Sequence, residues 1–331
     1  MLKNVIKKLF KILYYLIPSF IRKPLNAYRN TLYMNKIAIG PNDFHKQIIF
    51  EADGNNIVRE RLLKKEPLMV ARIGGTEMKC MYHYLNKRKD KDNPIPYSQG
   101  MKEEAAFLSG IYPQEDWLID AFCKIYIDSI KNTDIMAVWY NAGENTVCKE
   151  YCPDADLIHL DSLESFFYDN PWTEVLENKK VLVISPFGDT MYSQYQKKDV
   201  LFKNPKVLPN FEFKIYKPIQ AIGGGSDKFS NWIEAFQFMC DEIEKIDFDV
   251  SIVSAGAFGL PLAAHIKKMG KKAVHLGGVT QVLFGIKGIR WDLRPKYSEG
   301  VYNENWVYLP KNTRPNNPEK MIEYEGNLLY W

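Results

Sequence analysis

The sequence predicts an α/β fold: a doubly wound, Rossmann-like and mostly parallel sheet. Short continuous apolar runs alternate with helical patterns along the 331 residues, and 46% of the residues are hydrophobic, enough for a large core. Continuous apolar runs are typical of parallel strands that helices cover on both faces. Their alternation with helices is typical of a doubly wound sheet. Charged residues make up 25% of the chain, an ordinary fraction that excludes wholesale disorder.

The first predicted element is a basic amphipathic helix within residues 1–40. Apolar residues recur at helical spacing over residues 2–17, and lysines occupy the opposite face. Residues 1–42 hold eight Lys and Arg and no Asp or Glu. The whole chain carries +4, so its remainder carries −4, which argues against a nucleic-acid-binding body.

Two locations are possible for this N-terminal helix. The apolar run is too short to span a bilayer, which needs about 20 residues, and no signal-peptide cleavage site follows it. We expect residues 1–23 to lie on an anionic membrane surface, at the inner face of the plasma membrane. The alternative is a helix packed on the protein's own core.

The body, residues 41–290, is expected to form one domain, with residues 291–331 as an aromatic-rich tail packed on it. Helical patterns cover residues 227–246 and 261–269, the latter stopped by Gly270. The predicted strands cover residues 68–73, 135–139, 157–160, 181–185, 250–254 and 273–276. Ligands of such sheets bind beyond the carboxyl ends of the strands, where we looked for functional residues.

Several chemistries are excluded by missing patterns. Five scattered cysteines do not form a disulfide framework, which favours a reduced, cytoplasmic compartment. No second Cys or His pair accompanies Cys148 and Cys152 at zinc spacing. No P-loop and no G-x-S-x-G elbow occurs. No acid lies between Asp249 and Asp292 to bind the ribose of NAD, so we expect no NAD. We expect no haem and no zinc either.

The first strand end carries the most distinctive residues. It runs from Arg72 through Gly74, Gly75 and Thr76 to Glu77. The glycines would let the backbone approach a ligand, Arg72 offers a fork of donors for phosphate, and Glu77 offers a carboxylate for a metal or a proton. The alternative is a structural turn with an Arg–Glu pair, followed by a helix that Thr76 caps.

Two later strand ends add candidates. Asp189 follows the strand at 181–185, either in a sugar pocket or as a helix N-cap. Ser254, Gly256 and Gly259 follow the strand at 250–254 in a G-x-G-x-x-G-like pattern with Ser first, which could present amides to a diphosphate. His275 ends the last predicted strand and could contact ligand.

The tail is rich in aromatic residues, which suit sugar rings. The alternative is a tail that completes the core, and this alternative fits Tyr330 and Trp331 better than Trp291 or Trp306. We therefore expect Trp291 and Trp306 to lie at an acceptor site.

These residues resemble a known family. The segment from Arg72 to Glu77 is similar to the R-I-G-D-G-E signature of GT-D-type glycosyltransferases, whose D-x-E motif helps hold a divalent metal and a sugar nucleotide. Residues 253–264 and 272–278 resemble the strand–glycine turn–helix–strand unit that closes that fold. The match covers about residues 45–290, and the tail looks like that of a branch found in bacterial surface-polysaccharide gene sets, such as those for capsule and lipopolysaccharide. The signature's Asp falls on Gly75, so Glu77 alone remains of the pair.

The resemblance implies a glycosyltransferase that moves a sugar from a nucleoside diphosphate donor to a polysaccharide or lipid-linked acceptor. Manganese or magnesium would bind at Glu77 if a metal is used, and Glu77 could equally act as a base without one. The candidate catalytic carboxylates are Glu77, Asp189 and Glu304. The candidate donor-binding residues are Arg72, Gly74, Gly75, Thr76, Ser254, Gly256, Gly259 and His275.

Two alternatives stay open at this point. One is a sugar-nucleotide-binding or scaffold protein that does not catalyse transfer. The other is a hydrolase that uses Glu77 and Asp189 as a carboxylate pair.

Overall fold

The computed structural model describes residues 39–89, 95–326 and 328–331. The predicted amphipathic helix at 2–17 lies outside these residues. Among the residues that are described, no helix has both the length and the apolar character that a bilayer span requires.

The described residues form a seven-stranded, fully parallel sheet with strand order β3-β2-β1-β7-β6-β4-β5. This confirms the predicted α/β, doubly wound architecture. The strands are β1 (Leu68–Ala71), β2 (Ile135–Val138), β3 (Asp156–His159), β4 (Lys180–Ile184), β5 (Glu212–Tyr216), β6 (Val250–Val253) and β7 (Lys272–His275).

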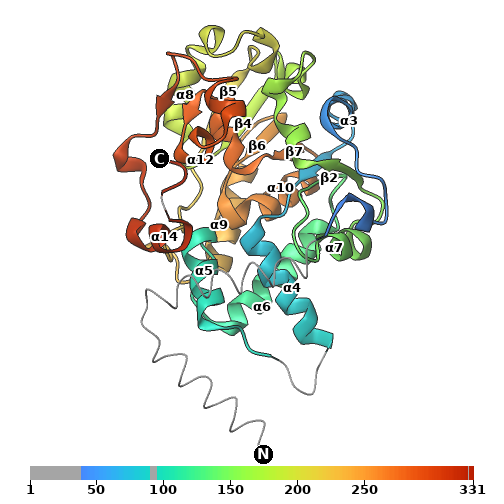
Figure 1. Cartoon of the computed structure of the whole chain (residues 1–331), viewed down its shortest axis with the longest axis vertical. Coiled ribbons are helices and arrows are strands. Elements are labelled where there is room, and N and C mark those ends of the chain that lie inside the picture. Colours follow the sequence, from blue (N-terminus) through green and yellow to red (C-terminus); the bar gives the residue numbers. More distant parts are fainter. Residues whose placement is uncertain (1–38, 90–94, 327) are drawn as a thin grey trace, which may run out of the picture.

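Helices cover both faces of the sheet, as Figure 1 shows. On one face lie α4 (Gly75–Lys89), α5 (Gln99–Ser109), α6 (Asp116–Ile130), α7 (Glu144–Tyr151), α9 (Trp232–Glu244) and α10 (Gly259–Lys268). On the other face lie α3 (Glu51–Leu63), α8 (Gly188–Tyr195), α11 (Thr280–Leu283), α12 (Ile289–Asp292) and α13 (Pro295–Ser298). α14 (Pro318–Glu325) contributes Met321 to the core of that face and lies beside α5.

Each strand contributes side chains to two separate cores, because successive side chains point to opposite faces. In β1, Met69 and Ala71 join the core under α6 and α10, whereas Leu68 and Val70 join the core under α3. All four are buried, which explains why the strand reads as one apolar run.

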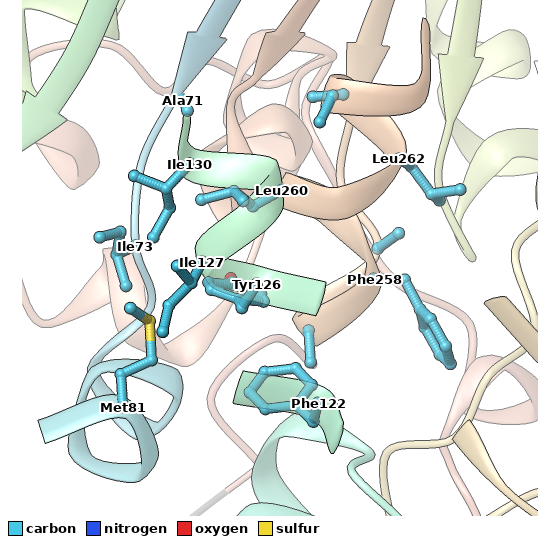
Figure 2. Close-up of a cluster of buried hydrophobic side chains, with 14 of the residues drawn as sticks. Ala71, Ile73, Met81, Phe122, Tyr126, Ile127, Ile130, Phe258, Leu260 and Leu262 are labelled. Carbon is cyan, nitrogen blue, oxygen red and sulfur yellow. The ribbon is translucent and has the colours of Figure 1, made fainter. Parts of the chain in front are cut away.

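The first core includes the contact between α6 and α10. Figure 2 shows Tyr126 and Ile130 of α6 close to Leu260 of α10. Trp232 of α9 stacks on Phe258, with ring centroids 5.0 Å apart, and meets Phe122 edge-on at 5.1 Å. These ring contacts join α6, α9 and the residue that precedes α10.

The structure differs from the predicted elements at three places. The sequence pattern missed β5 because it is an edge strand whose side chains are only partly buried, so no continuous apolar run marks it. The helix expected from residue 227 begins at Trp232, because the Asn231 side chain caps it by accepting hydrogen bonds from the amides of Ile233 and Glu234. The helix expected from residue 261 begins at Gly259.

Residues 291–331 pack on the second core. Tyr297, Trp306 and Trp331 are buried there, and β9 (Val307–Tyr308) pairs with β8 (Ile286–Lys287) in a two-stranded sheet. Tyr324 of α14 donates a hydrogen bond to Glu103 of α5 at 2.7 Å, so the tail also reaches across to the N-terminal half of the chain. Figure 1 shows α14 beside α5.

Candidate active site

A cavity of about 350 Å³ lies beyond the carboxyl ends of six strands. Its volume is within the range of small-ligand pockets. The chain passes from β1 to β2 and β3 on one side of β1. The later strands β4 to β7 all lie on the other side, and β7 is the one that pairs with β1. The cavity therefore lies at the topological switch point, the usual ligand position in doubly wound sheets. The lining residues that end or follow these strands include Arg72, Gly74, Trp139, Pro186, Pro218, Ser254, His275 and Gly277.

Arg72 is held where β1 ends. Its guanidinium lies over the Trp139 ring, 5.4 Å from the centroid. The other side of the guanidinium is so close to Gly277 that a Cβ atom there would overlap Nη1, and Gly277 has a φ of +68°. Only glycine meets both conditions without strain. Arg72 Nε is buried and has no hydrogen-bond partner.

The N-terminus of α4 lines the same cavity, from Gly74 to Glu77. The amide of Met78 donates to the carbonyl of Gly74 at 2.8 Å, which closes the first helical turn. The amides of Gly75, Thr76 and Glu77 precede this bond and have no acceptor within the helix. With the positive end of the helix dipole, they favour an anionic ligand beside Arg72. Thr76 is thus a first-turn residue and not the predicted N-cap.

Three carboxylates line the cavity, and two of them are neutralised by cations. Glu104 pairs with Lys79 at 2.5 Å, and Glu325 pairs with Arg290 at 3.3 Å. Glu77 is 6% exposed and has no hydrogen bond or ion pair among the described residues. In particular, the Arg–Glu pair of the purely structural alternative does not form there. Glu77 is the carboxylate that the described structure leaves available for a ligand.

His275 ends β7 and is 3% exposed. Burial, together with the positive charge of Arg72, lowers the pKa of His275 to about 3, so the ring is neutral at physiological pH. A Cβ atom at Gly259 would overlap the His275 ring. Gly259 therefore allows α10 to pack on His275, and it is not part of the cavity lining, contrary to its predicted role at phosphate.

Four buried polar atoms of the lining lack hydrogen-bond partners among the described residues: Arg72 Nε, Tyr126 Oη, His275 Nδ1 and Glu325 Oε2. They come from the end of β1, from α6, from β7 and from α14, which are far apart in the sequence. Such atoms are rare in folded proteins because each costs free energy when it is left unpaired. Their presence on one cavity indicates a polar ligand. Leu108, Ile219, Ile222 and Phe187 form an apolar wall for the less polar part of that ligand.

The structure places two predicted catalytic carboxylates elsewhere. Asp189 lies in the first turn of α8, exposed, and pairs with Lys217 at 2.5 Å. It is neither in the cavity lining nor the N-cap of α8, which is Phe187. Glu304 is exposed in a turn before β9 and is also absent from the lining. Their proximity to a strand end and to an aromatic tail was a misleading signal.

The structure places the two tail tryptophans away from the cavity. Trp291 is 5% exposed and Trp306 is 4% exposed; both belong to the second core and neither lines the cavity. The Trp306 indole donates to the carbonyl of Leu201 at 3.0 Å, so its polar edge is satisfied within the protein. Tyr330 and Trp331 were expected to complete the core; Trp331 belongs to the second core and Tyr330 packs against it, and both also line the cavity.

Sequence reasoning missed several residues of the lining. Trp139 directly follows β2, so its position beyond a strand end could have identified it. Tyr126 lies inside α6, Arg290 lies in α12 and Glu325 lies in α14; no local pattern distinguishes them.

A metal would have one protein carboxylate at this site. No group of three or more His, Cys, Asp or Glu side chains gathers as a metal-binding cluster within the described residues. A single carboxylate such as Glu77 fits a divalent cation that takes its other ligands from phosphate and water, as magnesium commonly does.

No protein-family model and no curated protein matches the sequence. Two solved structures of a domain of unknown function 1792 (DUF1792) match, one of them a selenomethionine-substituted form. The other is described as having a distinct glycosyltransferase fold. For each, 10% of residues are identical, the TM-score is 0.36, and the match covers 78% of this chain and 96% of the solved chain.

Proposed function

We propose that the protein is a glycosyltransferase that uses a nucleoside diphosphate sugar as donor. The observation that supports this most is the placement of Arg72 beside the N-terminus of α4, with unpartnered Glu77 in the first turn of the same helix. One region of the cavity is thus suited to bind a diphosphate, and a carboxylate lies next to it.

In the proposed reaction, an acceptor hydroxyl attacks the anomeric carbon of the donor sugar. The new carbon–oxygen bond forms while the bond from that carbon to the diphosphate breaks, and the hydroxyl proton passes to a base. Arg72 and the α4 amides bind the departing diphosphate and stabilise the charge that it gains. Glu77 accepts the proton or orients the hydroxyl. His275 stays neutral, so it can form a hydrogen bond to the ligand without competing with Arg72 for the phosphates.

A divalent cation, if used, would be held by Glu77 and the donor phosphates and would supply further positive charge to the leaving group. The proposal does not depend on it. Asp189 is absent from the cavity lining, so the Glu77–Asp189 pair of a hydrolase is not formed.

Calorimetry with nucleoside diphosphates tests donor binding. Arg72→Ala is expected to weaken binding at least about tenfold, since it removes a charge-assisted contact to phosphate. Arg294→Ala is the matched control, because Arg294 is exposed and lies outside the cavity lining. If the wild type binds no nucleoside diphosphate, the proposed function is wrong.

Turnover separates an enzyme from a binding protein. Glu77→Gln keeps the shape of the side chain and removes its charge, so we expect it to abolish sugar transfer while donor binding and thermal stability are retained. Wild-type protein that binds sugar nucleotides but never transfers or releases the sugar would instead be a binding or scaffold protein.

We also propose that the acceptor is a growing or lipid-linked glycan of cell-surface polysaccharide synthesis, met at the inner face of the plasma membrane. The acid-free basic composition of residues 1–42 supports this, although most of that segment lies outside the described residues. Changing Lys7, Lys8 and Lys11 to Glu should release the protein from anionic vesicles. Unchanged partitioning of this variant would overturn the membrane proposal.

A further inference from the structure

A second arginine reaches the cavity from the C-terminal part of the chain. Arg290 lies in α12 and lines the cavity together with Glu325 and Tyr330. Its side chain is 28% exposed, so the guanidinium is partly desolvated yet reachable by a ligand. The function proposed above does not use this cation.

The Arg290 guanidinium is held in one orientation. Nη1 donates to Tyr330 Oη at 3.0 Å and Nη2 donates to Glu325 Oε1 at 3.3 Å. The guanidinium also lies over the Tyr330 ring, 4.5 Å from its centroid. The backbone amide of Arg290 donates to the carbonyl of Leu329 at 2.9 Å, which fixes the tail beside it. A fixed guanidinium needs little further ordering to bind an anion.

Arg290 and Arg72 flank the same pair of glycines. Arg72 packs on Gly277, and Tyr330, the partner of Arg290, packs on Gly278, where an added Cβ atom would lie 2.6 Å from the ring. Because these glycines are consecutive, Arg72 and the Arg290–Tyr330 pair lie beside the same short backbone segment of the cavity lining.

Glu325 is an incomplete partner for Arg290. Only Oε1 contacts the guanidinium, while Glu325 Oε2 is buried without a hydrogen-bond partner. Burial raises the pKa of Glu325, and Arg290 opposes that shift. A phosphate group offers more oxygens and more charge in a geometry that the arginine fork accepts. Exchange of Glu325 for phosphate would therefore improve the interactions of Arg290.

We propose that Arg290 is a second phosphate-binding group. It pairs with Glu325 until an anionic ligand takes the place of Glu325. This inference rests on the proposed function and deepens it: Arg72 binds one phosphate of the donor and Arg290 the other, so the cavity selects diphosphates over monophosphates.

Calorimetry on the full chain with inorganic pyrophosphate and orthophosphate tests this selection, without a choice of nucleoside. Arg290→Gln should weaken pyrophosphate binding about tenfold or more and change orthophosphate binding by less than about twofold. Glu325→Gln should have the opposite effect and tighten pyrophosphate binding several-fold, because it frees Arg290 while keeping the side-chain shape. Arg294→Gln, a control outside the lining, should leave both affinities unchanged.

Opposite changes in pyrophosphate affinity for Arg290→Gln and Glu325→Gln would exclude an ion pair whose role is only structural. If the pair only fastens the tail, both variants will lower thermal stability and weaken pyrophosphate binding together, which would overturn the inference. Arg290→Lys keeps the charge without the fork, so it should fold and give intermediate affinity even if Arg290→Gln does not fold.

Failure of this inference can be told from failure of the proposed function. Pyrophosphate binding that Arg72→Ala abolishes, but that neither Arg290→Gln nor Glu325→Gln alters, would refute the role of Arg290 alone. Wild-type protein that binds neither pyrophosphate nor nucleoside diphosphates would refute both.

Discussion

Gly74 and Gly75 are neighbours in the sequence, but their surroundings differ. A Cβ atom at Gly74 would overlap the carboxylate of Glu77, whereas one at Gly75 would be 3.6 Å from its nearest neighbour, an ordinary contact distance. Gly74 therefore determines where the Glu77 carboxylate can lie. Gly75, the position at which the resembled family has its Asp, has room for a side chain.

This difference gives a test of Glu77 that leaves Glu77 in place. Gly74→Ala should lower sugar transfer about 100-fold, the size of a lost general base, because the carboxylate must rotate away. Gly75→Ala, the matched control, should retain transfer within a few-fold. Steady-state kinetics and melting temperatures of both variants are the measurement. Equal activities would show that the position of the Glu77 carboxylate is unimportant.

At the scale of elements, one buried carboxylate shapes the turn after β2. Glu144 begins α7 and is fully buried, and its Oε2 accepts hydrogen bonds from the amides of Trp139 and Asn141, both at 3.1 Å. The Trp139 indole in turn donates to the carbonyl of Ile73 at 2.8 Å. Glu144 thus fixes the ring on which Arg72 lies.

This carboxylate predicts a pH dependence of stability. Burial raises the pKa of Glu144 from 4.5 to about 7, against the hydrogen bonds from Trp139 and Asn141. Between these values the unfolded chain has released the proton and the folded chain retains it, so the free energy of unfolding falls as pH rises from 4.5 to 7. Glu144→Gln cannot titrate and should gain about 3 kcal/mol relative to wild type over that window.

Urea unfolding at pH 5 and pH 8 measures this gain. Glu150→Gln, on the exposed side of the same helix, is the control and should follow the wild type at both pH values. A constant difference between Glu144→Gln and wild type would show that Glu144 does not titrate in this range.

How far the sequence predicts the site depends on where each residue lies relative to a strand. Arg72, Ser254 and His275 directly follow or end apolar runs, and parallel strands bring their carboxyl ends together, so their convergence could be predicted. Tyr126 and Arg290 reach the cavity through helix packing and through the path of the tail, which no local pattern encodes. Aromatic content alone could not separate Trp306, a core residue, from Tyr330, a cavity residue.

For the whole molecule, the tail contributes stability through Trp306. Trp306→Ala removes a buried indole and its hydrogen bond to Leu201, so the free energy of unfolding should fall by about 3–5 kcal/mol. Trp117→Ala, at a site 52% exposed, should change it by less than about 0.5 kcal/mol. Urea unfolding gives both values. If Trp306→Ala raised the KM for the acceptor without lowering stability, Trp306 would belong to the acceptor site and not to the core.

The position of β1 between β2 and β7 has a consequence for synthesis of the chain. A nascent chain can pair β1 with β2 early, but the other edge of β1 has no partner until β7 has emerged from the ribosome. Such non-local pairing slows folding, and an open apolar edge invites association with other chains. β1, an interior strand that positions Arg72, thus keeps one edge unpaired through most of translation, and that interval is when a chaperone would matter most to this protein.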